Sequence, residues 1–203
     1  QHENDREATA ADLKWLADPA EEPEPFGDGG TKMAWNTFNV VSIYPNGNPV
    51  MSDVNQRWVG DCCACAVIAS MAYLYPRFVK HIIKDNMDKT YTVTMYDPKG
   101  KQISVGVGGD YFIGNSGDLG ALGGRNKEVT WATILEKAMI KWNQIYQGSS
   151  NVGGIGTEYV SAIFTGDGES VGFGANALIA EDLQRAVEVS LKQGRLVIGG
   201  FTR

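Results

Sequence analysis

The chain has 203 residues, of which 43% are hydrophobic, so it is long and apolar enough to bury a core. A net charge of −6 argues against a nucleic-acid surface, which needs clustered Lys and Arg. Three cysteines are too few for a disulfide framework, and no apolar run approaches the roughly 18 to 20 residues that span a bilayer. We therefore expect a folded domain with a free thiol, no nucleic-acid partner and no membrane span.

Residues 1–34 are predicted to form an acidic, proline-rich extension or pro-segment. The stretch "DPAEEPEPFGDGG" (18–30) has the composition of a segment that stays unfolded, whereas "TAADLKWLAD" (9–18) predicts a short helix capped at Thr9. Because the chain begins at Gln1 rather than Met, we expect a processed N-terminus. We favour a secreted or cell-envelope bacterial protein over a cytoplasmic one.

The main domain is predicted to cover residues 35–203 and to open with extended structure and a turn over 35–53. The stretch from Cys62 to Tyr75 has no Gly or Pro and predicts a helix that is buried on most sides. The alternating stretches "YTVTMY" and "QISVGV" flank the turn sequence "DPKGK", which predicts a β-hairpin over 90–107.

The second half of the chain alternates between glycine-rich and helical patterns. Eight glycines in residues 106–124 predict a long surface loop rather than regular structure. Apolar residues at helical spacing predict an amphipathic helix over 131–146 with Thr130 as its N-cap. A last helix is predicted over 180–193, ending at Gly194, and "RLVIGGFTR" then predicts the start of a strand.

The stretch "GDCCAC" places three cysteines at the start of the first predicted helix of the main domain. A zinc site would need four spaced ligands, and the chain offers only His2 and His81 in addition. Cys65 is expected to be a small core residue, as free cysteines often are. Cys62 directly follows a Gly-Asp turn at the helix start, where unpaired N–H groups favour a thiolate, so we interpret it as a nucleophile.

A thiolate that attacks a carbonyl carbon also needs hydrogen-bond donors for the oxyanion. Gln56 lies six residues before Cys62, across a turn that allows its amide to fold back beside the thiol. The segment resembles the "Q-G-x-x-G-D-C-W" nucleophile segment of the calpain family, within the papain-like class of cysteine peptidases. Two residues differ, because Arg57 replaces the family's Gly and Cys63 replaces its Trp.

The resemblance extends over roughly residues 50–200. "WATILEKA" (131–138) is similar to the family's Trp-led "L-L-E-K-A" helix, and a Gly-Gly pair at 153–154 and "FTGDG" (164–168) follow in the family's order. It implies an α+β papain-like core, of which this chain is the mainly helical half, with a central nucleophile helix and a small hairpin. It also implies Cys62 as nucleophile, with Gln56 and the Cys62 N–H as oxyanion donors.

The resemblance implies that the remaining catalytic residues lie elsewhere. Calpains take their His and Asn from a second half-domain, and the sequence stops at Arg203 before any such segment. His81 is interpreted as an ordinary surface histidine. We therefore expect a partner, the C-terminal half of the same precursor, separated by proteolytic nicking, and we expect this chain alone to be inactive.

The family also binds calcium in this half-domain, which the resemblance carries to four positions. Asp53 stands where the family has a ligand carboxylate, with carbonyl oxygens around Asn46 and Asn48, and Glu128 is the acid nearest to Trp131. Hard oxygen ligands suit Ca²⁺. The alternative is that these are solvated polar residues on a surface loop.

These observations predict a calpain-like cysteine endopeptidase that acts on proteins or peptides. The alternative function is a non-catalytic module that keeps the calpain-like fold for binding or regulation, with Cys62 merely buried.

Overall fold

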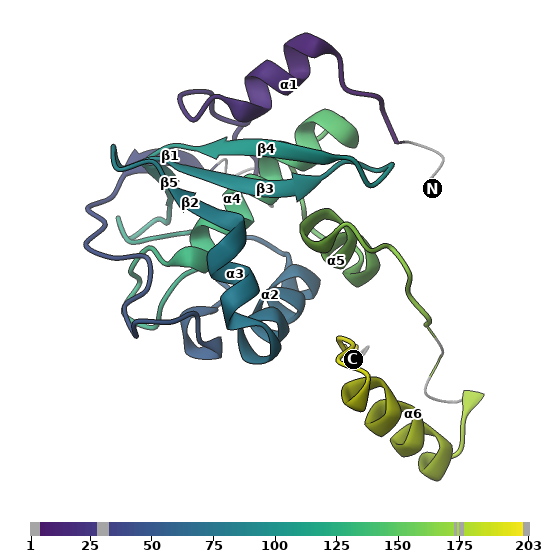
Figure 1. Cartoon of the computed structure of the whole chain (residues 1–203). Coiled ribbons are helices and arrows are strands. Elements are labelled where there is room, and N and C mark those ends of the chain that lie inside the picture. Colours follow the sequence, from purple (N-terminus) through teal and green to yellow (C-terminus); the bar gives the residue numbers. More distant parts are fainter. Residues whose placement is uncertain (1–4, 28–32, 173, 175–176, 201–203) are drawn as a thin grey trace.

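The computed structural model describes residues 5–27, 33–172, 174 and 177–200 (Figure 1). Within these residues, helices surround two small antiparallel sheets, which confirms the predicted α+β class. One sheet has the order β2-β3-β4 and the other pairs β1 with β5. The strands are β1 (Ala34–Thr37), β2 (Ile83–Asp85), β3 (Tyr91–Tyr96), β4 (Gln102–Val107) and β5 (Asp110–Ile113).

The predicted hairpin is confirmed as β3 and β4, which pair from Tyr91 opposite Val107 to Tyr96 opposite Gln102. Alternate residues of β3 are buried, as a strand with one covered face requires. Strand β2, which the sequence did not predict, adds a third strand through the pair Ile83 and Val93.

Helix α4 (Trp131–Tyr146) forms the centre of the core and has the predicted bounds. Thr130 caps it, because its Oγ1 accepts a hydrogen bond from the Ala132 N–H at 3.3 Å. The helix was predicted to be amphipathic, but its polar residues are covered as well, since every residue from 131 to 143 is buried. The charged members of this buried stretch are Glu136, Lys137 and Lys141.

The glycine-rich stretch 106–124 is not the surface loop that its composition predicted. It contains the end of β4 and the whole of β5, and residues 119–124 are all buried. Glycine is used here for close packing: a Cβ at Gly123 would lie 2.5 Å from the Glu128 carbonyl oxygen. Local composition cannot distinguish a mobile glycine from one that another backbone approaches closely.

Helix α2 (Cys62–Leu74) is confirmed, and it continues after a bend of 113° into α3 (Pro76–Ile82). Val67, Ile68 and Met71 face the core, whereas Tyr73 is exposed. In the described part of the chain, the only segment with the length and apolarity of a bilayer span is this bent pair, and no single helix qualifies. The short η1 (Met51–Asp53) precedes α2, and α5 (Thr157–Thr165) packs against both α2 and β3.

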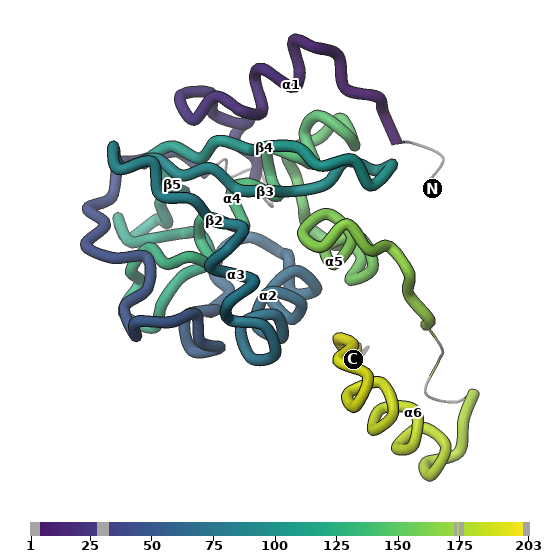
Figure 2. The backbone as a smooth tube through the Cα atoms, in the orientation of Figure 1, coloured from purple at the N-terminus to yellow at the C-terminus, as the bar shows by residue number. Residues whose placement is uncertain are grey.

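The first residues of the chain form a segment that we call the N-terminal strap (residues 5–26), which contains α1 (Ala10–Ala17). Thr9 caps α1 as predicted, in a reciprocal capping box with Asp12. The strap runs along the outer side of the β3–β4 hairpin, where α1 packs on β4 (Figure 2). Leu16 is fully buried. The interpretation of this region as a pro-segment stays a prediction, because packing does not reveal processing.

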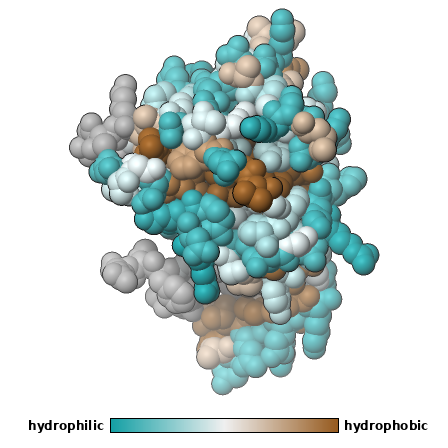
Figure 3. Space-filling view, turned by 90° about the vertical axis from the view of Figure 1, so that its left-hand side faces the viewer, coloured by the Kyte–Doolittle hydropathy of each residue, from teal (hydrophilic) through white to brown (hydrophobic). Residues whose placement is uncertain are grey.

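Helix α6 (Ala180–Lys192) is confirmed near its predicted bounds and lies apart from the other helices (Figure 1). None of its residues is buried. Residues 195–200 form no strand, because no neighbouring strand is there to pair with them, and 201–203 lie outside the described residues. On the face of the molecule that Figure 3 shows, hydrophobic residues gather in a band bordered by hydrophilic ones.

Candidate active site

Cys62 is the first residue of α2, and its thiol is free and exposed. The preceding residue, Asp61, is the N-cap, but its side chain makes no capping hydrogen bond. The first-turn N–H groups of α2 are therefore free of a side-chain cap beside the thiol. Such groups, with the positive end of the helix dipole, stabilise a nearby anion.

Gln56 lies in the turn that leads to Cys62 and is also exposed. Its Nε2 donates a hydrogen bond to the Val59 carbonyl oxygen at 2.9 Å. A glutamine amide has two N–H groups, so this contact leaves one of them able to donate elsewhere. Gln56 and Cys62 thus lie on one short turn, as the sequence predicted, and their catalytic roles stay predictions.

The turn is fastened to the buried segment 119–124 by backbone hydrogen bonds. Asn55 and Gly123 exchange a pair of them, with N–O distances of 2.9 and 3.3 Å. The Trp58 N–H donates to the Gly120 carbonyl oxygen at 3.1 Å. Arg57, which replaces a family glycine, donates from its guanidinium to the Gly124 carbonyl oxygen. These contacts connect the turn to the buried segment.

The other two cysteines have less favourable surroundings for a thiolate. Burial, followed by the neighbouring Cys62, raises the pKa of the Cys63 thiol. Burial also raises the pKa of the Cys65 thiol, and the charge of Asp61 adds to that effect. All three cysteines are free. The structure therefore leaves Cys62 as the one exposed thiol of the three.

Two acidic side chains that the sequence reasoning did not single out lie behind this turn. Asp61 is 1% exposed, and burial raises its pKa to about 6. Glu136, from α4, is equally buried, and burial together with the charge of Asp61 raises its pKa well above the ordinary value. Asp61 and the "L-E-K-A" pattern that contains Glu136 were both visible in the sequence, but nothing local indicated that the two carboxyl groups interact.

The predicted calcium ligands already have hydrogen-bond partners within the protein. The Asp53 carboxylate already accepts hydrogen bonds from Asn46 Nδ2, the Val50 N–H and Trp131 Nε1, at 2.9, 3.3 and 2.8 Å. The Lys80 ammonium donates a hydrogen bond to Asn48 Oδ1 at 3.0 Å, so a positively charged side chain already contacts Asn48.

Glu128 is half-buried and has one carboxyl oxygen without a protein partner. No group of three or more His, Cys, Asp or Glu in the described ranges is arranged to hold a metal. Calcium binding at these positions stays a prediction.

No imidazole accompanies the thiol in the described part of the chain. His81 is exposed in the last turn of α3, which follows the far end of α2 from Cys62. A 13-residue helix is about 20 Å long. His2 lies outside the described residues. The general base for the Cys62 thiol is therefore not supplied by His81.

The comparison with known proteins agrees with this arrangement. The model of the calpain family of cysteine proteases matches residues 34–200, which is most of the chain. The chain therefore belongs to the calpain family of cysteine proteases, and the predicted resemblance is confirmed. A search of curated proteins found no match. The matched region begins at β1, so the N-terminal strap lies outside it.

Proposed function

We propose that this chain is the nucleophile-bearing half of a calpain-like cysteine endopeptidase, with Cys62 as its nucleophile. The observation that carries the proposal is that Cys62 is exposed at the uncapped start of α2, while the other cysteines are more buried and have raised pKa values. A protease of this family acts on proteins or peptides, so the substrate is a polypeptide that reaches the exposed end of α2.

The proposed chemistry is acyl transfer through a thioester. The Cys62 Sγ attacks the peptide carbonyl carbon, a C–S bond forms, and the carbonyl oxygen becomes an oxyanion. The free N–H of the Gln56 amide and the Cys62 backbone N–H are the donors for that oxyanion. The C–N bond then breaks and the amine leaves with a proton, after which water hydrolyses the thioester and releases the acid.

The proton transfers in this sequence need a general base and acid, and we propose that a His on a C-terminal half of the same precursor serves as both, with an Asn of that half orienting its imidazole. His81 does not, because it is on α3, beyond the far end of α2. The isolated chain is then expected to be inactive. The exposed, unpartnered α6 suits a second half that packs beside it.

The test is thiol labelling combined with peptide cleavage by the longer polypeptide that carries both halves. Cys62→Ala should abolish cleavage and prevent covalent labelling by an electrophilic epoxide, because it removes the attacking sulfur. Cys65→Ala is the matched control: it deletes a thiol of the same helix that points at Asp61, and it should still be labelled at Cys62.

The peptidase proposal fails if the wild-type polypeptide does not react with the epoxide and the Cys62→Ala variant cleaves peptides as well as the wild type. The alternative function, a non-catalytic module with a calpain-like fold, would then be favoured. The exposed Cys62 thiol is the observation against that alternative, because a module kept only for binding gains nothing from an exposed cysteine at a helix start.

Calcium dependence is a separate proposal for the same half. It would require Asp53 to exchange N–H donors for the ion and the Lys80 ammonium to move away from the loop, where it contacts the Gly47 carbonyl oxygen and Asn48 Oδ1. No step of the proposed chemistry depends on it.

A further inference from the structure

The two buried carboxyl groups behind the nucleophile turn each have one oxygen with a partner and one without. Asp61 Oδ1 accepts a hydrogen bond from the Cys65 thiol at 3.5 Å, and Glu136 Oε2 accepts one from the Leu122 N–H. The other oxygens, Asp61 Oδ2 and Glu136 Oε1, are buried and have no hydrogen-bond partner in the described ranges. Buried polar atoms of this kind are rare and call for an explanation.

The electrostatics of the pair point to a missing proton donor. The charge of Asp61 raises the pKa of Glu136, so the two carboxyl groups interact electrostatically. No cation lowers the pKa of either group. Two carboxylates in one buried site cannot both be ionised at moderate cost, so one of them keeps its proton. A protonated carboxyl has an O–H donor, which is what the two unpartnered oxygens lack.

We propose that Asp61 and Glu136 share one proton, held between Asp61 Oδ2 and Glu136 Oε1 directly or through one buried water, and that this pair positions Cys62. Asp61 is the N-cap of α2, so the link joins the start of the nucleophile helix to α4. Glu136 is a positioning residue in this proposal, because it acts on Cys62 through Asp61 and does not touch the substrate.

The same glutamate reaches the other side of the turn through segment 119–124. Its Oε2 accepts from the Leu122 N–H, while Thr133 on the same helix donates to the Leu122 carbonyl oxygen. Gly120 and Gly123 of that segment hold the turn that carries Gln56. Glu136 therefore connects both ends of the turn, at Asp61 and at the Gln56 side, to the rigid centre of the core.

Other titratable groups face the pair and define its surroundings. Cys65 interacts electrostatically with both carboxyl groups and Cys63 with Asp61, while Cys62 and Glu158 of α5 act on these thiols. All of them are thiols or acids, so none neutralises a second negative charge on the pair. Loss of the shared proton would place two repelling charges under the start of α2.

The first test measures the proton itself on this 203-residue chain, without any activity. At about pH 7.5, exposed carboxyl groups are ionised, so a protonated carboxyl band in the infrared spectrum would come from a buried group. The band should be present in the wild type and absent in Glu136→Gln, whose amide keeps both hydrogen bonds but cannot ionise. Glu188→Gln on exposed α6 is the matched control and should keep the band.

The second test is the pH dependence of the free energy of unfolding. The Glu136 pKa is raised in the folded state above its ordinary value of 4.5, so the proton stabilises the fold below pH 4.5 and this stabilisation is lost as pH rises. The stability advantage of wild type over Glu136→Gln should therefore shrink as pH rises above 4.5. A glutamate that only fills space would give a difference independent of pH.

The positioning role rests on the proposed function and is tested in the longer polypeptide. Glu136→Leu removes both hydrogen bonds at similar volume and should lower kcat by up to about 100-fold with little change in KM, because misplaced reacting groups slow the chemical step. Glu136→Gln should restore most of kcat.

A band that persists in Glu136→Gln, or a stability difference that does not change with pH, would overturn the shared proton. An unchanged kcat in Glu136→Leu would overturn the positioning role. Because the infrared and stability measurements need no activity, their outcome does not depend on whether Cys62 is a nucleophile.

Discussion

The two ends of the chain contrast in how they meet the core. The N-terminal strap lies outside the region matched to the calpain family, yet Leu16 is fully buried and the strap is bound along its length. Helix α6 lies inside the matched region, has the more strongly amphipathic sequence, and buries no residue. Family membership and amphipathic pattern therefore do not indicate which segment is part of the folded unit. A segment packs on the core only where the rest of the chain offers a surface complementary to that segment.

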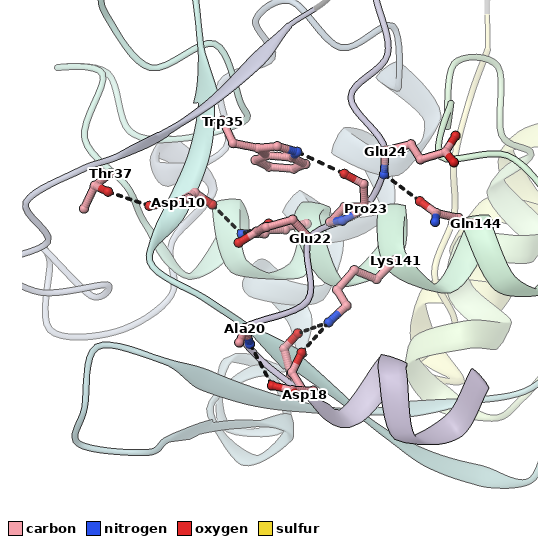
Figure 4. Close-up of polar contacts among 12 residues, drawn as sticks. Asp18, Ala20, Glu22, Pro23, Glu24, Trp35, Thr37, Asp110, Lys141 and Gln144 are labelled. Atoms are coloured by element: carbon pink, nitrogen blue, oxygen red, sulfur yellow. Dashed lines mark hydrogen bonds and ion pairs between the residues drawn. The ribbon is translucent and has the colours of Figure 1, made fainter. Parts of the chain in front are cut away.

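The surface that receives the strap is built from α4 and β4. Lys141 Nζ donates to the Asp18 and Gly106 carbonyl oxygens, both at 2.8 Å, and so joins the strap to the strand (Figure 4). Lys137 forms an ion pair with Glu22 at 2.6 Å. In α6, the side-chain hydrogen bonds of Gln184 and Ser190 go to Glu188 and Ala186 of the same helix and not to the core.

Further along, the strap is held by two more polar contacts. The Trp35 indole donates to the Pro23 carbonyl oxygen at 3.0 Å, and Gln144 accepts from the Glu24 N–H at 2.7 Å (Figure 4). The buried lysines of α4 thus act as donors to the strap rather than as a solvated face. If the strap is ever cut from the rest of the chain, these contacts would keep it bound.

The largest expected difference in stability between the two ends comes from shortening a buried side chain. Leu16→Ala should lower the free energy of unfolding by about 2–5 kcal/mol, because it removes a fully buried leucine and leaves a cavity. The matched control Leu191→Ala, on α6 where the side chain is 47% exposed, should change it by less than about 0.5 kcal/mol. Urea unfolding measures both, and equal losses at the two sites would contradict the contrast.

The sequence predicted elements better than it predicted their surroundings. The bounds of α4 followed from apolar spacing and the Thr130 cap, both of which are local. The burial of Glu136, Lys137 and Lys141 was missed, because periodicity assumes that a polar face meets water. That assumption fails when a distant segment covers the face.

In the candidate site, too, local features could be predicted and long-range contacts could not. The placement of Gln56 and Cys62 on one turn could be predicted because only six positions of sequence separate them. The partnership of Asp61 and Glu136 was not found, since 75 residues separate them and only the packing of α2 against the core brings them together.

A glycine pair offers a second, smaller comparison of the two ends. A Cβ at Gly108 would lie 2.5 Å from the Pro19 carbonyl oxygen of the strap, so Gly108→Ala should force the strap to shift and cost about 1–3 kcal/mol. At Gly199, in the segment after α6, an added Cβ meets nothing within 4 Å. Gly199→Ala should therefore leave the melting temperature unchanged. Similar changes in melting temperature for both variants would show that the strap does not pack closely against Gly108.

The last comparison is a pH dependence at Lys141. Burial, together with the charge of Lys137, lowers the Lys141 pKa from 10.5 to about 8. Between pH 8 and 10.5 the unfolded chain therefore binds more protons than the folded chain, so this group makes the fold more stable as pH rises through that window. The free energy of unfolding of the wild type should rise relative to Lys141→Met over the same window, measured by urea unfolding at several pH values. Lys192→Met, which removes a lysine from exposed α6, controls for the change in net charge. A difference that stays flat, or that falls as pH rises, would mean that the strap does not bury a charged Lys141.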